Sequence, residues 1–231
     1  MPSSAPSEPA TAPAPMTDET RATDAIIRPG GATNCTPHRS DAMAEPREQV
    51  SARLRERLDA AVDAGDPVNV AQEVKHVLQD TLRCDALSLP DRYRGTRADT
   101  YARRLLYRDP SGRYTIVVMA WGAGQRTALH DHAGIWCVEC VVDGQMEVTQ
   151  YDLVSNSEDR YQFAERTRVH AGRGSAGCLI PPFEYHVLSN LAEQPSITMH
   201  VYGGEMDHCH VFEPAGDGSY RRHTKALAYH D

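Results

Sequence analysis

Two histidines one residue apart are the part of this sequence best suited to chemistry. His130 and His132 lie in the segment TALHDH. A β-strand turns alternate side chains to the same face, so the two imidazoles can meet at one metal ion. A third histidine, His186, follows in a later apolar segment, and neutral imidazole is the commonest metal ligand in proteins. Cys137 and Glu139 share a strand face with each other, and either side chain could approach the same ion.

The charge of such a site indicates its chemistry. Three neutral imidazoles without a carboxylate leave a divalent ion with its full positive charge and with open coordination positions. This suits an anionic soft donor such as a thiolate, because the thiol pKa of about 8.5 falls on coordination. The histidines therefore predict a metal site that holds a substrate thiol deprotonated near neutral pH.

The charge balance favours a small-molecule partner. The sequence has 24 Lys and Arg against 32 Asp and Glu, a net charge of -8, and no basic patch, which argues against nucleic acid and membranes as partners. It has no apolar run of transmembrane length, and its N-terminal residues lack the basic start and apolar segment of a signal peptide. A cytoplasmic location is therefore expected.

The cysteines are expected to be free thiols, because their spacing is irregular and a cytoplasmic compartment keeps thiols reduced. The run from Cys137 to Cys140 has the form of a CxxC motif. On a strand, however, positions three apart face opposite sides, and the sequence has no second CxxC to complete a zinc site. The six cysteines are Cys35, Cys84, Cys137, Cys140, Cys178 and Cys209.

The first part of the chain divides into a tail and a helical segment. The first 46 residues hold eight of the fifteen prolines and almost no apolar periodicity, so they cannot bury enough surface to offset their ordering entropy. Apolar residues at helical spacing predict helices over 48–64 and 70–84. The predicted units are a disordered tail, 1–46, and a domain, 47–231, made of a helical cap of two or three helices, 47–88, and a barrel, 97–231.

The rest of the chain has the pattern of an all-β core. Short β-branched and aromatic runs alternate with Gly-rich turns, which indicates a double-sheet barrel of the jelly-roll type. Asp217 and Gly218 predict a hairpin turn. The predicted strands are 114–121, 137–153 with a break at 143–144, 178–180, 185–188, 196–202 and 210–213.

The segment around the histidines resembles the first metal-binding motif of the cupin barrels. Gly124, His130, His132, Cys137 and Gly144 reproduce its spacing, with cysteine at the position where most cupins have glutamate. The resemblance implies a cupin-type double-stranded β-helix, which is a jelly-roll barrel.

A later segment resembles the end of the second cupin motif. His186, three residues and Asn190 match it, and Pro181 stands at the expected proline. Phe183 replaces the motif's glycine, and Gly174 lies one residue early. With both motifs in place, the three histidines are expected to bind one metal ion.

Four features together resemble the cysteine dioxygenase family of thiol dioxygenases, in its bacterial form. They are YARRLL at 101–106, WGAGQRTALHDH at 121–132, Cys137, and TMHVY at 198–202. The resemblance implies that the metal held by His130, His132 and His186 is Fe(II).

The resemblance also implies a substrate-binding arginine. Arg103, in the segment that begins at Tyr101, would pair with the substrate carboxylate. Arg104 is the alternative, because a one-residue insertion at 109–111 leaves the register open. A planar guanidinium suits this role, since it forms two charge-assisted hydrogen bonds with one carboxylate.

A later strand is expected to complete the site. Thr198, His200 and Tyr202 alternate along it and so share one face. The resemblance implies that the Tyr202 hydroxyl meets bound dioxygen, with His200 and Thr198 orienting it. Cys137 stands where animal members have a cysteine that crosslinks to a tyrosine. It would either form a thioether with Tyr202 or remain a small apolar residue.

The implied reaction adds both atoms of O2 to a small carboxylate-bearing thiol and gives a sulfinic acid. Arg103 favours L-cysteine, whereas Trp136 resembles relatives that act on 3-mercaptopropionate. Mercaptosuccinate and ergothioneine also stay open, because 203–205 replace a Ser-Pro-Pro run that follows the tyrosine in animal members. Apart from the thiol and O2 no partner is expected, and the barrel is expected to be a monomer or a weak homo-oligomer.

Two other functional classes stay open. A metal-dependent cupin of different chemistry, such as an isomerase, would use Glu139 as a fourth ligand, although Glu139 lies two residues beyond the motif's glutamate position. A non-catalytic cupin would only bind a ligand. His208 and His210 flank Cys209 and are read as surface histidines of a strand.

Overall fold

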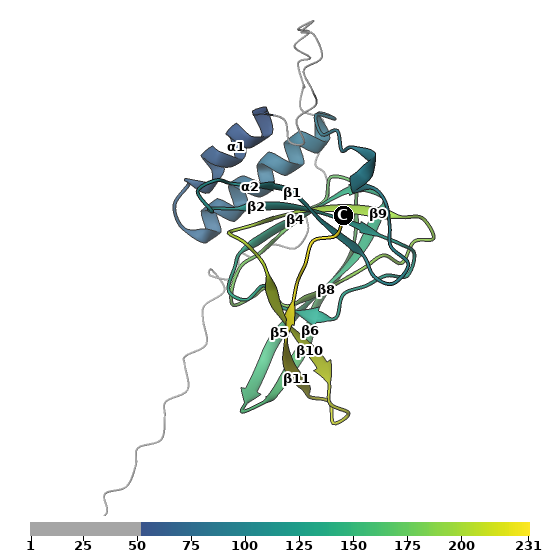
Figure 1. The fold of residues 1–231 in the computed structure, drawn as a ribbon. Coiled ribbons are helices and arrows are strands. Elements are labelled where there is room, and N and C mark those ends of the chain that lie inside the picture. Colours follow the sequence, from purple (N-terminus) through teal and green to yellow (C-terminus); the bar gives the residue numbers. More distant parts are fainter. Residues whose placement is uncertain (1–51) are drawn as a thin grey trace, which may run out of the picture.

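The computed structural model describes residues 52–231, which form two α-helices, a short 3-10 helix and eleven β-strands (Figure 1). The predicted disordered tail lies outside the described residues. Within 52–231, no helix is both long and apolar enough to cross a membrane.

The two predicted helices are present as α1 (Ala52–Val62) and α2 (Pro67–Arg83). Helix α2 begins where the sequence allows it, because the Asp66 side chain accepts hydrogen bonds from the backbone N–H groups of Val68 and Asn69 and a proline occupies the first turn. The helices lie over a face of a β-sheet (Figure 1) and not over an open end of the barrel.

The strands form two antiparallel sheets, as expected for the predicted cupin fold. The first has the order β1-β2-β9-β4-β7 and consists of β1 (Ala102–Arg108), β2 (Thr115–Trp121), β4 (Cys137–Asp143), β7 (Ala176–Leu179) and β9 (Ser196–Tyr202). The second closes into a barrel in the order β10-β11-β6-β5-β8-β3 and consists of β3 (Leu129–His130), β5 (Gln145–Ser157), β6 (Arg160–Gly172), β8 (His186–Ser189), β10 (His208–Pro214) and β11 (Tyr220–Ala226).

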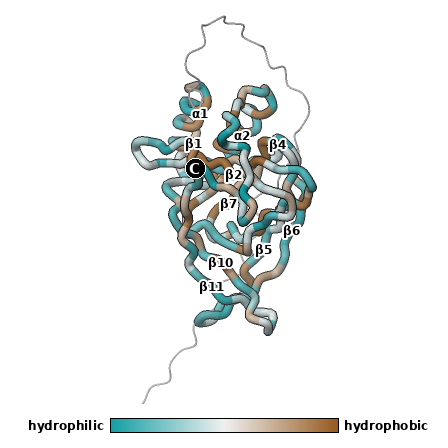
Figure 2. Tube along the Cα trace, turned by 45° about the vertical axis from the view of Figure 1, so that its right-hand side comes forward, coloured by the Kyte–Doolittle hydropathy of each residue, from teal (hydrophilic) through white to brown (hydrophobic). Residues whose placement is uncertain are grey.

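The five-stranded sheet separates two hydrophobic clusters. On β4, Val138, Cys140 and Val142 pack in the cluster that includes the helices, whereas Cys137 and Val141 belong to a cluster on the barrel side. Strands β2 and β9 divide their side chains in the same way. Figure 2 shows the hydrophobic part of the chain beneath the helices and a more hydrophilic β10–β11 end. Every second residue of β4 and β9 therefore points into the barrel.

Several strands were not predicted, because their patterns differ from half-buried alternation. Strands β6 and β11 carry mostly exposed or half-buried polar side chains, and β1 reads ARRLLYR, with two adjacent arginines. They hold their place by pairing with long neighbours, β6 with β5 along its whole length and β11 with β10. The hairpin turn predicted at Asp217 and Gly218 does connect β10 and β11.

The prediction of free thiols is confirmed for four cysteines and wrong for one. Cys137, Cys140, Cys178 and Cys209 are buried free thiols. Cys84, just after α2, is disulfide-bonded.

Candidate metal centre

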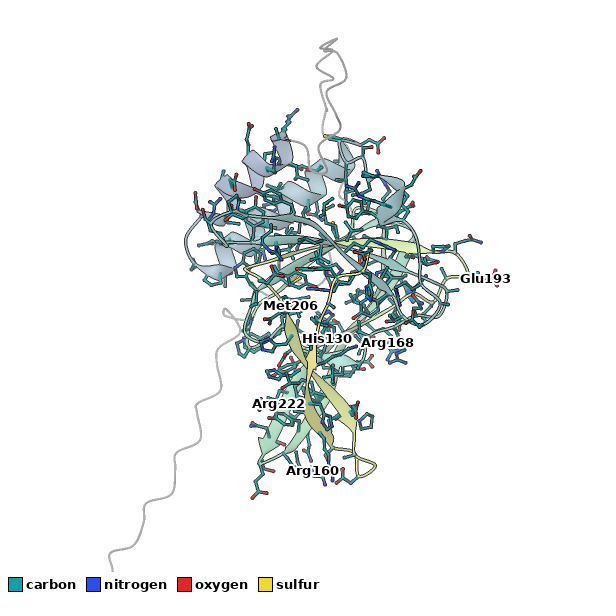
Figure 3. The ribbon with its side chains drawn as sticks, in the orientation of Figure 1. His130, Arg160, Arg168, Glu193, Met206 and Arg222 are labelled. Carbon is teal, nitrogen blue, oxygen red and sulfur yellow. The ribbon has the colours of Figure 1, made fainter. Side chains whose placement is uncertain are left out.

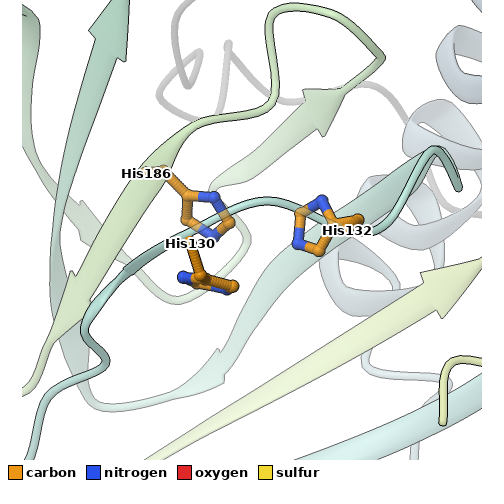
Figure 4. Close-up of side chains that lie close together, drawn as sticks. All are labelled: His130, His132 and His186. Atoms are coloured by element: carbon orange, nitrogen blue, oxygen red, sulfur yellow. The ribbon is translucent and has the colours of Figure 1, made fainter. Parts of the chain in front are cut away.

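The three predicted histidines converge inside the barrel (Figure 4). His130 on β3 and His186 on β8 are directly opposed in the antiparallel pair, and His132 follows in the loop after β3. Each offers one ring nitrogen, and these three atoms lie within 4.8 Å of one another. Within the described residues this is the only such set of three or more His, Cys, Asp or Glu side chains.

Backbone contacts orient two of the rings. The Nδ1 atom of His130 lies 3.1 Å from the carbonyl oxygen of Ala128, and that of His186 lies 2.8 Å from the carbonyl oxygen of Glu184. A carbonyl can only accept, so each Nδ1 carries the proton and each Nε2 keeps its lone pair. The Nε2 of His186 is buried and has no hydrogen-bond partner among the described residues.

The surroundings keep the imidazoles neutral. Burial lowers the pKa of His130 and holds the pKa of His132 and of His186 well below the usual range. Neutral rings with unpaired lone pairs, all aimed at one point, are what a divalent non-haem metal requires. The residues present therefore fit such a metal.

A carboxylate fixes the loop that carries His132. Asp131 is buried, and its Oδ1 accepts hydrogen bonds from the backbone N–H groups of Ala133 and His210. Its Oδ2 lies 2.9 Å from the Nδ1 of His210 on β10. The chain then reverses through two positive φ angles, at Ala133 and Gly134. Of the two histidines read as surface residues, His208 is half exposed and pairs with Asp207, whereas His210 belongs to this support.

Strand β9 brings Thr198, His200 and Tyr202 to the barrel side of the sheet. The indole N–H of Trp121 donates to the Thr198 hydroxyl at 2.9 Å, and that hydroxyl lies 2.8 Å from the Nε2 of His200. The rings of His200 and Tyr202 are stacked with centroids 5.9 Å apart, and the Tyr202 ring lies 5.8 Å from that of His132. Burial lowers the pKa of His200 to about 3 and raises the pKa of Tyr202 well above its usual range, so both are neutral.

Cys137 lies opposite Tyr202 in the β4–β9 pair. Its sulfur is buried and lies 4.0 Å from the Nδ1 of His200. Burial raises the pKa of the Cys137 thiol well above its usual range. The residue therefore stands beside the Tyr202 ring as a neutral thiol.

The structure separates the two candidate arginines. Arg103 is 2% exposed, and its Nη2 donates to the carbonyl oxygen of Met206 at 2.7 Å, whereas its Nε and Nη1 have no partner in the described part of the chain. Arg104 points to the other side of β1, where its Nη1 donates to the carbonyl oxygen of Gly95. Figure 3 shows Met206 and His130 in the same region, far from Arg160 at the end of the β5–β6 hairpin. Tyr101, the other predicted substrate-binding residue, stacks on Trp121 with centroids 4.4 Å apart.

The segment after Tyr202 forms one edge of the Arg103 pocket. The ring of Tyr229 lies 4.6 Å from the Arg103 guanidinium, and its hydroxyl donates to Glu205 at 2.7 Å. A Cβ at Gly203 would lie 2.2 Å from the Trp136 indole, so only glycine fits there. The departures from the Ser-Pro-Pro run thus make specific contacts at this edge.

Two buried carboxyl groups were not assigned to the site from the sequence. Glu139 is 5% exposed, and its Oε2 lies 3.6 Å from the Nε2 of His186. Burial raises the pKa of Glu139 to about 8. The cupin motif spacing argued against Glu139, but the shared strand face with Cys137 already pointed to it. Glu184 is 4% exposed, and burial raises its pKa to about 7; its apolar neighbours gave no signal.

Comparison with known proteins agrees with this geometry. The family model described as cysteine dioxygenase type I matches residues 49–215. Cysteine dioxygenase type 1 of Rattus norvegicus is 26% identical over 156 residues, covering 65% of this chain and 72% of the relative, and that of Homo sapiens is 22% identical over 155 residues with the same shares. A Cupin 2 conserved barrel domain protein from Salinispora arenicola is 16% identical, with a TM-score of 0.36, over 50% of this chain and 86% of that chain. The family match spans most of the described chain and all three histidines, and this chain belongs to the cysteine dioxygenase type I family of oxidoreductases.

Proposed function

We propose that this protein is an iron-dependent thiol dioxygenase that converts a small carboxylate-bearing thiol into a sulfinic acid. The observation that carries the proposal is the buried Arg103 guanidinium, which keeps two unpaired nitrogens on the same side of the sheet as the three histidines. A buried cation with unpaired donors needs an anion, and a substrate carboxylate supplies one.

The reaction is balanced without an outside reductant. The thiol and O2 combine to give the sulfinic acid, so that the sulfur loses four electrons and both oxygen atoms end on it. His130, His132 and His186 would hold the metal, which we assign as Fe(II) from the family. Bound Fe(II) supplies the one-electron chemistry by which O2 reacts with a thiolate.

Arg103 orients the substrate. Its Nε and Nη1 present a planar fork to the carboxylate, while the bond from Nη2 to Met206 and the Tyr229 ring hold the guanidinium still. Each charge-assisted bond contributes roughly 1.5 to 3 kcal/mol. The carboxylate fixes one end of the substrate, and the thiol at the other end is then directed toward the histidines.

Tyr202 supplies a proton donor on the opposite wall. Because burial raises its pKa, its hydroxyl stays protonated and donates to negative charge that develops on oxygen. The hydrogen-bonded series Trp121, Thr198 and His200 supports the ring stack that positions Tyr202. Tyr202 therefore stabilises the oxygen atoms as they transfer.

The same pair of strands favours the thioether between Cys137 and Tyr202. Oxidation by O2 would remove one hydrogen from the thiol and one from the ring as the carbon–sulfur bond forms. Mass spectrometry of the peptides that contain the two residues should find them linked, with the mass lower by two hydrogens. Separate peptides of full mass after turnover would leave Cys137 as an apolar residue of the site.

Oxygen uptake by the iron-loaded protein tests the proposed function. L-cysteine is the first substrate to try, followed by 3-mercaptopropionate, mercaptosuccinate and ergothioneine. We expect one sulfinic acid for each O2 consumed with at least one of them. Metal-loaded protein that consumes no O2 with any of these thiols would favour a cupin of another class, such as an isomerase.

A further inference from the structure

Glu139 is a buried carboxyl group that the proposed reaction does not use. It lies on β4, between the two inward-facing neighbours Cys137 and Val141, and is 5% exposed. Its Oε2 has no hydrogen-bond partner among the described residues. An unpaired buried carboxylate is costly, so an undrawn partner is expected to satisfy it.

The nearest atoms indicate what that partner is. The Glu139 Oε2 lies 3.6 Å from the Nε2 of His186 and 3.7 Å from the Nδ1 of His200, and both distances are too long for hydrogen bonds. The Nδ1 of His186 is bonded to a carbonyl, so its Nε2 presents a lone pair. Two buried lone pairs that face each other at this distance require a cation between them.

We propose that Glu139 is a fourth protein ligand of the metal, joining His130, His132 and His186. Two atoms bonded to one ion at about 2.1 Å lie roughly 3 to 3.5 Å apart, close to the separation found between Glu139 and His186. A cavity of about 10 Å³ lined by Glu139, Val141 and Thr198 leaves the carboxylate room to turn toward the ion.

A fourth ligand changes what the metal accepts. A carboxylate cancels one positive charge and leaves two positions on a six-coordinate ion, one of which the reaction needs for O2. The remaining position takes the substrate sulfur and leaves none for an amine. Resting on the proposed function, this part of the inference makes an amine-free thiol such as 3-mercaptopropionate a better substrate than L-cysteine.

Titration of the metal-free protein with Co(II) tests the ligand without any turnover. Glu139→Gln and Glu139→Leu should weaken Co(II) binding by roughly ten- to a hundred-fold and change the visible absorption that reports coordination number. Glu147→Gln removes the same charge from the outer side of β5, where Glu147 pairs with Arg168, and should leave both unchanged.

Equal Co(II) affinity and an identical absorption spectrum in the parent and both Glu139 variants would overturn the ligand assignment. Replacing a buried acid with a neutral side chain seldom unfolds a protein. If the leucine variant does not fold, the glutamine variant, which keeps the shape of the side chain, decides the question alone.

Oxygen uptake by iron-loaded protein tests the substrate part. The parent should have a higher kcat/KM for 3-mercaptopropionate than for L-cysteine, and Glu139→Gln should move this ratio toward cysteine by about ten-fold or more. An unchanged ratio overturns the substrate part. No uptake with any thiol, together with the Co(II) changes, overturns the substrate part and the proposed function but leaves Glu139 as a ligand.

Discussion

Arg103 and Arg104 show how one position along a strand decides a residue's chemistry. The two are neighbours of the same type, yet Arg103 is buried with unpaired nitrogens, and Arg104 is bonded to the backbone at the surface. The sequence resemblance left both open because it lacked the register of β1. Alternation along β1, once the strand is paired with β2, places only one of them inside.

Arg103→Ala should raise the KM for carboxylate-bearing thiols by roughly ten- to a hundred-fold, because it removes two charge-assisted hydrogen bonds. Steady-state oxygen uptake measures this, with the metal content checked in parallel and expected to stay constant. Arg104→Ala is the matched control and should change KM by less than about two-fold. If the two variants had equal KM values, Arg103 would have no role in binding the carboxylate.

His186→Ala should reduce the iron content of the purified protein to below about a tenth of the parent, because two imidazoles rarely hold a divalent ion. Elemental analysis after dialysis gives the answer. His208→Ala, which changes a half-exposed histidine outside the centre, serves as the control and should retain the metal. Full iron occupancy in His186→Ala would remove that residue from the centre.

At the scale of elements, the site is made by alternation along β4 and β9. The sequence predicted the three histidines because their spacing is local and matches a known motif, and it predicted the shared face of Thr198, His200 and Tyr202 for the same reason. It missed the position of Glu139 relative to His186, since that distance depends on how β4 packs against β8 across the barrel. Strands β6 and β11 were missed because mostly exposed strands carry little hydrophobic pattern.

Asp131 joins the loop of His132 to β10, and its removal tests whether that loop must be fixed. Asp131→Asn should weaken metal binding by roughly ten-fold, because the backbone contacts weaken with the loss of the charge. Competition with a chelator measures the affinity. Asp207→Asn removes the neighbouring surface pair with His208 and should leave the affinity unchanged. Equal affinities in the two variants would show that the loop holds its shape without Asp131.

At the scale of the whole molecule, buried histidines connect stability to pH. Burial lowers the pKa of His130, His132, His186 and His200 below the ordinary 6.5, and that of His200 to about 3. Below pH 6.5 the unfolded chain therefore binds more protons than the folded one, and stability falls with pH. Glu139 acts in the opposite direction between pH 4.5 and 8, since burial raises its pKa to about 8.

The free energy of unfolding of the metal-free protein should therefore decrease as the pH falls from 6.5 to 4.5, by about 1 kcal/mol per pH unit for each histidine that stays neutral, less the single opposing term. Urea unfolding at several pH values measures the slope. Glu139→Gln should make the slope steeper, because the opposing group is gone. Stability that rises on acidification over this range would show that the histidines are protonated in the folded protein.

The sheet that separates helices from barrel has a consequence for altering this enzyme. On β4, residues 138, 140 and 142 belong to the helix-side cluster, while 137, 139 and 141 face inward. Randomising only the odd-numbered positions of β4 and the even-numbered positions of β9 would vary the pocket and leave the scaffold's own packing untouched. A selection for new thiol substrates can therefore sample this wall of the pocket with little loss of folded clones.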